Sequence, residues 1–363
     1  MLHPRLQGKL LFFALLLMPT SARSNYQILA NFNGSNGATP QAGVIMDSSG
    51  DLYGTTTEGG SANLGTIFQL SPGGTITTLI NFNGPNGAEP LLAGLIMDKS
   101  GNLFGTTFYG GTAFPGDGTV FKISPNDTLN TLIKFNGSNA ANPVAGVIMD
   151  SNGNLYGTTL GGGSATEGTA FKLSPDGTLT TLVNFGGSNG ANPYAGLLMD
   201  SNGNLYGTTL QGGASNEGTV FKLSPDGTLK TLISFNGSNG AYPYANLLMD
   251  SSGNLFGTTP YGGLSNEGTV FKLSPDGTIT TLHNFAGGSK DGAQPVANLF
   301  MDNGGNLYGT TSYGGSLNDG TVYELTGVTS VVPEPSKLLL FGQGVIGLLG
   351  LVWSGRRTLS QIR

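Results

Sequence analysis

The sequence has no cysteine and almost no histidine, and these two absences exclude much of the chemistry that enzymes use. Without cysteine there are no disulfides, no thiolate nucleophiles and no cysteine-based zinc sites. The only histidines are His3 and His283. A metal-binding histidine cluster or a Ser-His-Asp triad would therefore depend on His283 alone. Because equivalent positions in the chain carry Ile or Val, we interpret His283 as a tolerated substitution on an outer strand.

Charge is also scarce. Charged residues make up 10% of the chain, the formal net charge is −6, and no run of Lys or Arg occurs. A nucleic-acid partner would favour a basic stripe, so this composition argues against one. Glycine is abundant, with 62 residues. Low charge together with a regular apolar pattern is not typical of disorder, so we interpret the glycines as turn residues repeated many times.

One motif recurs along the chain: Met-Asp, four residues that are mostly small and polar, and then Leu-(Tyr/Phe)-Gly-Thr-Thr. Its six copies are 50 to 52 residues apart and begin at Met46, Met97, Met149, Met199, Met249 and Met301. Stacked repeats form one body, so the repeat overrides the two or three domains that 363 residues would otherwise suggest.

Each repeat predicts four short strands. In the second repeat these are residues 93–98, 102–107, 118–124 and 128–135, rich in β-branched and aromatic residues and bounded by turn residues. Helical periodicity is absent from the repeats. Four antiparallel strands per unit predict an all-β fold, a six-bladed β-propeller over residues 25–326. The predicted repeats lie near residues 42–82, 93–135, 145–185, 195–235, 245–285 and 297–325.

The last repeat lacks its fourth strand, whereas residues 26–32 match that strand and stand before the first motif. We expect this N-terminal strand to complete the last blade and remove an open sheet edge. An open solenoid is the alternative, and it would leave the N-terminal strand without a partner.

Acidic residues occur at two repeated positions. In the turn that begins at Asp150, the spacing departs from an EF-hand loop at Leu155 and Gly161, so the Met-Asp aspartates are interpreted as turn caps. A second set precedes Gly-Thr and is interpreted as loop polarity: Asp117, Glu167, Glu217, Glu267 and Asp319. No cofactor or metal site is expected, although one carboxylate per blade leaves weak calcium binding open.

Both ends carry sorting features. Residues 1–24 have a charged start, an apolar run and small residues at the exit, which predicts a secretory signal peptide. At the other end, a linker over residues 327–336 contains Pro333, Glu334 and Pro335, and an apolar stretch within residues 337–363 precedes Arg356 and Arg357. The stretch is at the short edge for a membrane span, with the arginines cytoplasmic.

This C-terminal tail resembles the PEP-CTERM sorting signal of Gram-negative bacteria that make exopolysaccharide. The resemblance implies an exosortase-like processing enzyme as a partner and transient anchoring through the C-terminal helix. It also implies export to the cell surface, outer envelope or extracellular matrix. A plain membrane anchor is the alternative. The repeats, as in residues 212–228, resemble the GloVer tandem repeat of exported bacterial proteins, which supports fold and location and supplies no mechanism.

Residues that differ between repeats are the best candidates for a binding site, because a requirement of the scaffold would recur in every blade. Aromatic residues collect in the long loops after the second and fourth strands: Phe108, Tyr109, Tyr194, Tyr242, Tyr244, Tyr261 and Tyr313. Tyrosines at a channel mouth suit a sugar ring or a peptide. The alternative is that each packs on neighbouring loop residues.

The sequence thus favours an exported, non-enzymatic glycan- or protein-binding module with no catalytic residues. A propeller enzyme acting on polysaccharide, a lyase or hydrolase, is the second hypothesis. Glycoside hydrolysis usually needs two carboxylates roughly 5–10 Å apart. Candidates beside the tyrosines are Glu58, Glu89, Asp117 and Glu267. A passive structural spacer is the third hypothesis.

Overall fold

The computed structural model describes residues 27–112 and 115–328, which are all-β with no helix. Within these ranges no helix is long and apolar enough to cross a bilayer. The predicted signal peptide, the Pro333-Glu334-Pro335 motif, the C-terminal helix and Arg356-Arg357 lie outside the described residues.

The described strands form five four-stranded antiparallel sheets, which we call units 1 to 5. Unit 1 contains β1 (Ile45–Met46), β2 (Leu52–Thr56), β3 (Thr66–Leu70) and β4 (Ile76–Asn81). Unit 2 contains β5 (Ile96–Met97), β6 (Leu103–Thr107), β7 (Thr119–Ile123) and β8 (Leu129–Lys134). Unit 3 contains β9 (Ile148–Met149), β10 (Leu155–Thr159), β11 (Thr169–Leu173) and β12 (Leu179–Asn184).

Units 4 and 5 repeat this pattern, and the last repeat departs from it. Unit 4 contains β13 (Leu198–Met199), β14 (Leu205–Thr209), β15 (Thr219–Leu223) and β16 (Leu229–Ser234). Unit 5 contains β17 (Leu248–Met249), β18 (Leu255–Thr259), β19 (Thr269–Leu273) and β20 (Ile279–Asn284). Unit 6 has three strands, β22 (Phe300–Met301), β23 (Leu307–Thr311) and β25 (Thr321–Leu325), beside a small pair, β21 (Gly292–Ala293) and β24 (Tyr313–Gly314).

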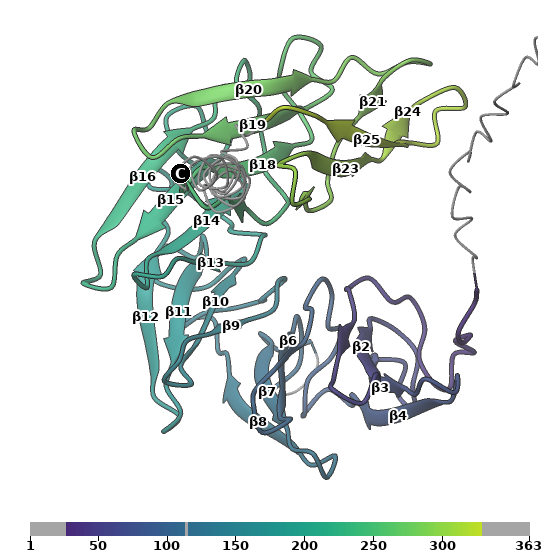
Figure 1. The fold of residues 1–363 in the computed structure, drawn as a ribbon. Helices are drawn as coiled ribbons and strands as arrows, with labels where there is room; N and C mark the ends of the chain where they lie inside the picture. The colour runs from purple at the N-terminus through teal and green to yellow at the C-terminus, as the bar shows by residue number, and fades with distance from the viewer. Residues whose placement is uncertain (1–26, 113–114, 329–363) are drawn as a thin grey trace, which may run out of the picture.

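The units follow one another around a central space, with β9 toward the centre and β12 at the outside in unit 3 (Figure 1). The prediction of four strands per repeat is confirmed for five units. The first strand of each unit is only two residues long, shorter than the predicted 93–98. Residues 93–95 instead precede the strand and face the interior, where Ala93 and Leu95 are buried.

The hydrophobic core lies between units. At the junction of units 3 and 4, Ala170 and Phe185 of one unit pack with Leu197, Leu205 and Phe221 of the next. Four further clusters repeat this arrangement at the other described junctions. Because each middle sheet is covered on both faces, adjacent residues of β15 such as Val220 and Phe221 are both fully buried.

The second threonine of the Gly-Thr-Thr motif fastens the loops to the sheet. In unit 4 the hydroxyls of Thr209 and Thr219 are 2.8 Å apart, and Thr209 Oγ1 donates to the carbonyl oxygen of Gln211 at 2.8 Å. Both side chains are completely buried. The same pair occurs in every unit. The recurrence of this threonine is therefore a requirement of the scaffold.

The Met-Asp aspartates cap the turn after the first strand. Asp150 Oδ1 accepts hydrogen bonds from the backbone N–H groups of Asn152 and Asn154, each at 2.9 Å. Its Oδ2 accepts from Asn154 Nδ2 at 2.7 Å and from the Tyr156 hydroxyl at 3.1 Å. Partial burial acts to raise the pKa of Asp150, but these hydrogen bonds outweigh it and hold the pKa below its ordinary value.

We expect stability to fall in acid because the pKa values of five capping aspartates are lowered in the folded state: Asp47, Asp98, Asp150, Asp200 and Asp302. Such groups stabilise the fold above about pH 4, and that contribution is lost as the pH drops through the folded pKa values. Thermal unfolding followed by circular dichroism from about pH 6 to about pH 2 tests this. Asp150→Asn should lower the melting temperature at neutral pH and weaken its acid dependence. An unchanged melting temperature down to about pH 3 would contradict the assignment.

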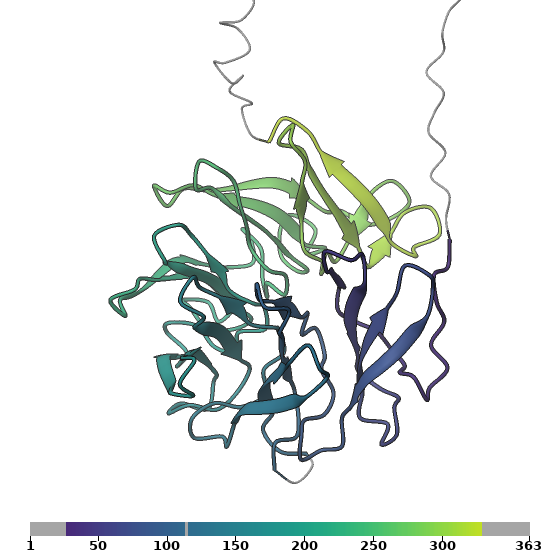
Figure 2. The ribbon, with the colours of Figure 1, turned by 60° about the horizontal axis from the view of Figure 1, so that its bottom comes forward.

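The predicted closure by the N-terminal strand is not observed. Residues 27–32 form no strand, so β25 pairs on one side only, with β23. The ring of sheets is open between units 6 and 1, and both views place the described N-terminal residues beside unit 1 (Figures 1 and 2). The physical sign of the missing partner is Val322, which is 81% exposed although its equivalent Val220 is fully buried.

Candidate binding site at the central cavity

A cavity of about 670 Å³ lies at the centre and is lined by residues of all six units. The segments that enter the first strands supply its walls, so the first strand of each unit is the innermost one. In five units the lining includes a residue that lies one or two positions after the loop proline: Gln41, Leu92, Tyr194, Tyr244 and Val296. No charged side chain lines the cavity. Its size is that of a small-ligand site.

Two of the predicted aromatic residues meet at this cavity. The rings of Tyr194 and Tyr244 make an edge-to-face contact, with centroids 4.9 Å apart, and both side chains line the cavity. Burial raises the pKa of Tyr244, and its neighbours Tyr194 and Tyr261 raise it further. Tyr244 therefore stays neutral at physiological pH and presents an apolar ring with a hydroxyl donor.

Two more predicted tyrosines extend this group. Tyr242 and Tyr261 are in edge-to-face contact, with centroids 6.1 Å apart, and Tyr261 is close enough to act on the pKa of Tyr244. The backbone pairing of Ala241 with Tyr261 brings the loop after β16 against the loop after β18. We call Tyr194, Tyr242, Tyr244 and Tyr261 the tyrosine cluster; of these four residues, Tyr194 and Tyr244 line the cavity and Tyr242 and Tyr261 do not.

Tyr242 occupies a backbone conformation that does not favour tyrosine. Its φ is 55°, in the left-handed region, and the equivalent residues of the other units share this conformation. In units 3 and 4 that residue is Asn142 or Asn192, a type that adopts left-handed φ readily. The asparagine side chains also bond the carbonyl oxygens of Phe108 and Leu160. The remaining units carry Thr39, Glu89 and Gln294 here, so the left-handed conformation belongs to the repeated loop and does not depend on the residue type.

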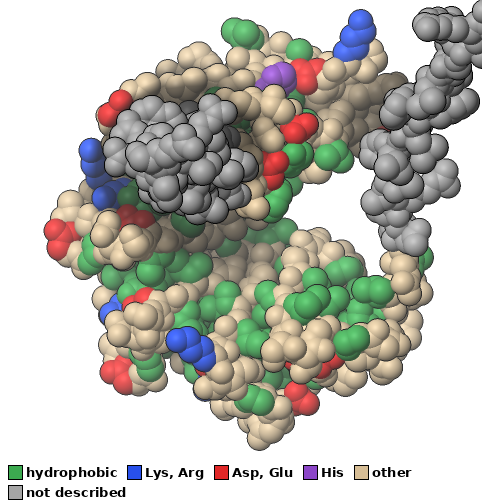
Figure 3. All heavy atoms as spheres, viewed as in Figure 1, with side chains coloured by type: hydrophobic (Ala, Val, Ile, Leu, Met, Phe, Trp, Pro, Cys, Tyr) green, Lys and Arg blue, Asp and Glu red, His purple; other side chains and the backbone are tan. Residues whose placement is uncertain are grey.

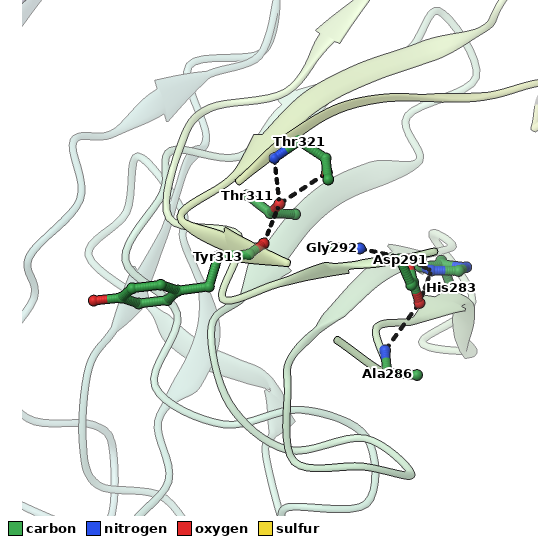
Figure 4. A network of polar contacts seen from close by, with 7 residues as sticks. All are labelled: His283, Ala286, Asp291, Gly292, Thr311, Tyr313 and Thr321. Carbon is green, nitrogen blue, oxygen red and sulfur yellow. Dashed lines mark hydrogen bonds and ion pairs between the residues drawn. The ribbon is translucent and has the colours of Figure 1, made fainter. Parts of the chain in front are cut away.

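The other predicted aromatics lie apart from the cavity. Phe108 and Tyr109 contact each other in the loop after β6, with centroids 4.6 Å apart. Tyr313 is 49% exposed, and its ring points away from the Thr311–Thr321 pair to which its backbone carbonyl is bonded (Figure 4). None of these three side chains lines the cavity.

The carboxylates proposed for an enzyme are not in the cavity. Burial raises the pKa of Glu89, and the charge of Glu58 raises it further, so these two lie near each other in the loops of units 1 and 2. Glu58 accepts a hydrogen bond from Thr39 at 3.1 Å. Neither they nor Asp117 and Glu267 line the cavity beside the tyrosines.

His283 has a specific partner that the sequence did not indicate. Its Nε2 lies 3.1 Å from Asp291 Oδ1, and Asp291 also accepts the backbone N–H groups of Ala286 and Gly292 (Figure 4). In unit 4 Asn239 takes the corresponding place by accepting the N–H of Asn236. Within the described part of the chain, no group of three or more His, Asp or Glu side chains is placed to hold a metal ion.

Two cavity residues were missed by sequence reasoning. Asn246 and Asn298 line the cavity where units 1 to 4 carry glycine. The sequence does carry a signal for these two residues, because each replaces a glycine that the other four repeats share. Viewed from the side of Figure 1, the surface is hollowed at its centre, with hydrophobic side chains gathered over units 1 and 2 (Figure 3).

Antiparallel sheets ordered from a central cavity outward define a propeller-like repeat protein. The family model described as the Gloeobacter/Verrucomicrobia repeat matches residues 16–149 and 148–333, so the chain belongs to that repeat family. This confirms the resemblance that the repeats suggested. The comparison with curated proteins finds no match.

Solved structures support the same fold. A streptogramin B lyase is 17% identical with a TM-score of 0.53, covering 82% of this chain and 85% of its own. Virginiamycin B lyase from Staphylococcus aureus is 14% identical with a TM-score of 0.53, covering 82% and 87%. A putative 6-phosphogluconolactonase from Bacteroides uniformis is 18% identical with a TM-score of 0.51, covering 80% and 82%. At these identities the likeness concerns the fold alone.

We expect Tyr194 and Tyr244 to be energetically coupled. A double-mutant cycle with Tyr194→Ala and Tyr244→Ala should give a coupling of about 1 kcal/mol in unfolding free energy, as edge-to-face aromatic pairs do. Denaturant unfolding provides the measurement. Tyr194→Ala combined with Tyr313→Ala is the control and should be additive, because no contact joins those rings. Additive behaviour of the first pair would show that its contact contributes nothing.

Proposed function

We propose that this protein is an exported, non-enzymatic binding module that holds a glycan at the central cavity through Tyr194 and Tyr244. One observation carries the proposal: Tyr194 and Tyr244 meet at an uncharged cavity of ligand size. Aromatic rings pack on the apolar faces of sugars, while hydroxyls and amides bond their oxygens.

The cavity favours binding over turnover. Hydrolysis of a glycoside usually needs two carboxylates flanking the bond, and no carboxylate lines this cavity. The lyases and lactonase with similar folds do not change this, because fold alone does not determine function. The enzyme hypothesis and the spacer hypothesis become outcomes of the binding experiment below.

The location is part of the proposal. We place the protein outside the inner membrane of a Gram-negative bacterium, exported by residues 1–24. There it would be processed near Pro333, Glu334 and Pro335 by an exosortase-like enzyme, with the C-terminal helix as a transient anchor. The support is the order of these sequence features and the membership in the repeat family. A surface or matrix location would bring the cavity into contact with extracellular polysaccharide.

The binding experiment uses the full chain and neutral polysaccharides, with and without calcium. Tyr194→Ala with Tyr244→Ala should weaken binding at least about tenfold, since central aromatic contacts dominate most interfaces. Tyr109→Ala and Tyr313→Ala are the controls and should bind as the parent does. Conversion of the polysaccharide into products would support the enzyme hypothesis. If no glycan binds, the proposal is overturned in favour of a protein partner or a structural spacer.

A closed six-bladed ring is also part of the proposal. Phe32 contacts Phe68 edge-to-face at 5.0 Å, just as Phe235, which follows β16, contacts Phe271 of the next unit at 5.3 Å. Residues 27–32 therefore already act on unit 1 as the end of a preceding fourth strand. Ile28 and Leu29 are 60% and 51% exposed, and Val322 is exposed on the unpaired edge of β25. Pairing of residues 27–32 with β25 would bury side chains on both segments.

The register of closure follows from the other units. Val220 stands opposite Ile233, two residues before Phe235, so Val322 should stand opposite Ala30, two residues before Phe32. Since the chain has no cysteine, Ala30→Cys with Val322→Cys should form an intramolecular disulfide in the monomer. Leu29→Cys with Val322→Cys is the control, because the side chains of Leu29 and Ala30 would point to opposite faces of the sheet. Disulfide-linked dimers would indicate strand exchange between copies, and no disulfide would refute closure.

A further inference from the structure

The repeated glycine at the axis is replaced in only two units. The residue after the alanine that enters each first strand is Gly43, Gly94, Gly146 or Gly196 in units 1 to 4. In units 5 and 6 it is Asn246 and Asn298, and both side chains are exposed to the central cavity. The change is confined to the side of the cavity where Tyr194 and Tyr244 meet.

Each of these asparagines has its oxygen fixed and its nitrogen free. Asn246 Oδ1 accepts the backbone N–H of Gly196 at 2.7 Å, and Asn298 Oδ1 accepts the backbone N–H of Asn246 at 2.8 Å. Among the described residues, neither Nδ2 group has a hydrogen-bond partner. Because the bond to Oδ1 fixes the plane of each amide, the two NH₂ groups hold a defined direction as donors at the cavity wall.

Two junctions between units have a hydroxyl bond that the asparagine junctions lack. In units 2 and 3, Thr106 and Thr158 donate to the carbonyl oxygens of Ala145 and Ala195 in the next unit, each at 2.9 Å. The equivalent hydroxyls of Thr208 and Thr258, ahead of the asparagines, are buried and have no partner, and the same holds for Thr55, ahead of Gly94.

Buried hydroxyls without partners are unfavourable. The hydroxyl bond between units is missing at both asparagine junctions and also at the glycine-containing junction of units 1 and 2, so its loss is not specific to asparagine. The case for the asparagines therefore rests on their free Nδ2 donors at the cavity wall.

We infer that Asn246 and Asn298 are specificity residues that donate their Nδ2 hydrogens to oxygen atoms of an uncharged pyranoside seated on Tyr194 and Tyr244. This inference rests on the proposed glycan-binding function and names the class of sugar. The two free NH₂ groups are hydrogen-bond donors, so they match hydroxyl, ring or acyl oxygens of the ligand. A carboxylate would lose its hydration in a cavity with no Lys or Arg to compensate it. Uronate sugars are therefore disfavoured.

Asn246→Asp and Asn298→Asp separate the two roles of each amide. Aspartate keeps an oxygen for the neighbouring N–H group and removes the free donor. Each variant should keep the melting temperature near that of the parent at neutral pH and bind the neutral glycan at least about tenfold more weakly. Asn216→Asp is the matched control, since Asn216 Oδ1 also accepts a backbone N–H, from Gly212 at 3.0 Å, away from the cavity.

Asn246→Gly tests the same residue without adding charge. It restores the glycine of units 1 to 4 and removes the amide donor, so binding should weaken while the protein stays folded. Affinity is measured by isothermal titration calorimetry with one neutral and one uronate oligosaccharide. Full affinity in the aspartate and glycine variants, with loss in Tyr194→Ala and Tyr244→Ala, would overturn this inference alone. Equal affinity for uronate would overturn the uncharged class, and no glycan binding by the parent would overturn both proposals.

Discussion

The structure depends on the packing of each sheet against the next. Units share no common core, because the centre is a cavity, and the apolar residues lie between successive sheets. The repeated contact is an aromatic pair such as Phe185 with Phe221, whose centroids are 5.1 Å apart. A unit stabilises its neighbours and is stabilised by them, so the two end units are each short of one partner. This constraint explains why Val322 is exposed in unit 6 and why Phe32 packs on unit 1.

The same constraint divides the chain into residues that must repeat and residues that are free to differ. The threonine pair, the capping aspartate and the glycines of the loops recur because they fasten each unit. The loops that enter the first strands project into the cavity, where no neighbouring sheet restricts them. Tyr194 and Tyr244 occupy such positions, as do Asn246 and Asn298. A symmetric scaffold thereby carries an asymmetric wall, and that asymmetry is the feature that a ligand would recognise.

Function in this architecture is linked to closure. The cavity is lined by residues of the first and the last unit as well as the middle ones, including Gln41 and Val296. Pairing of residues 27–32 with β25 would hold these two walls at a fixed distance. Because a binding site loses affinity when its walls move, a closed ring would organise the site in advance. Sorting at the two ends of the chain and binding at the centre would then use separate parts of one molecule.

The sequence by itself determined the repeat, the four strands of each full unit and the turn chemistry, because these follow from local patterns such as Asp150 to Asn154. It also indicated aromatic candidates by their failure to repeat. Tertiary structure decided which of these meet: Tyr194 joins Tyr244 across two loops, whereas Tyr109 and Tyr313 lie elsewhere. It alone revealed Asn246 and the unpartnered hydroxyl of Thr208. The physical reason is that contacts between units depend on distance in space, which spacing along the chain does not specify.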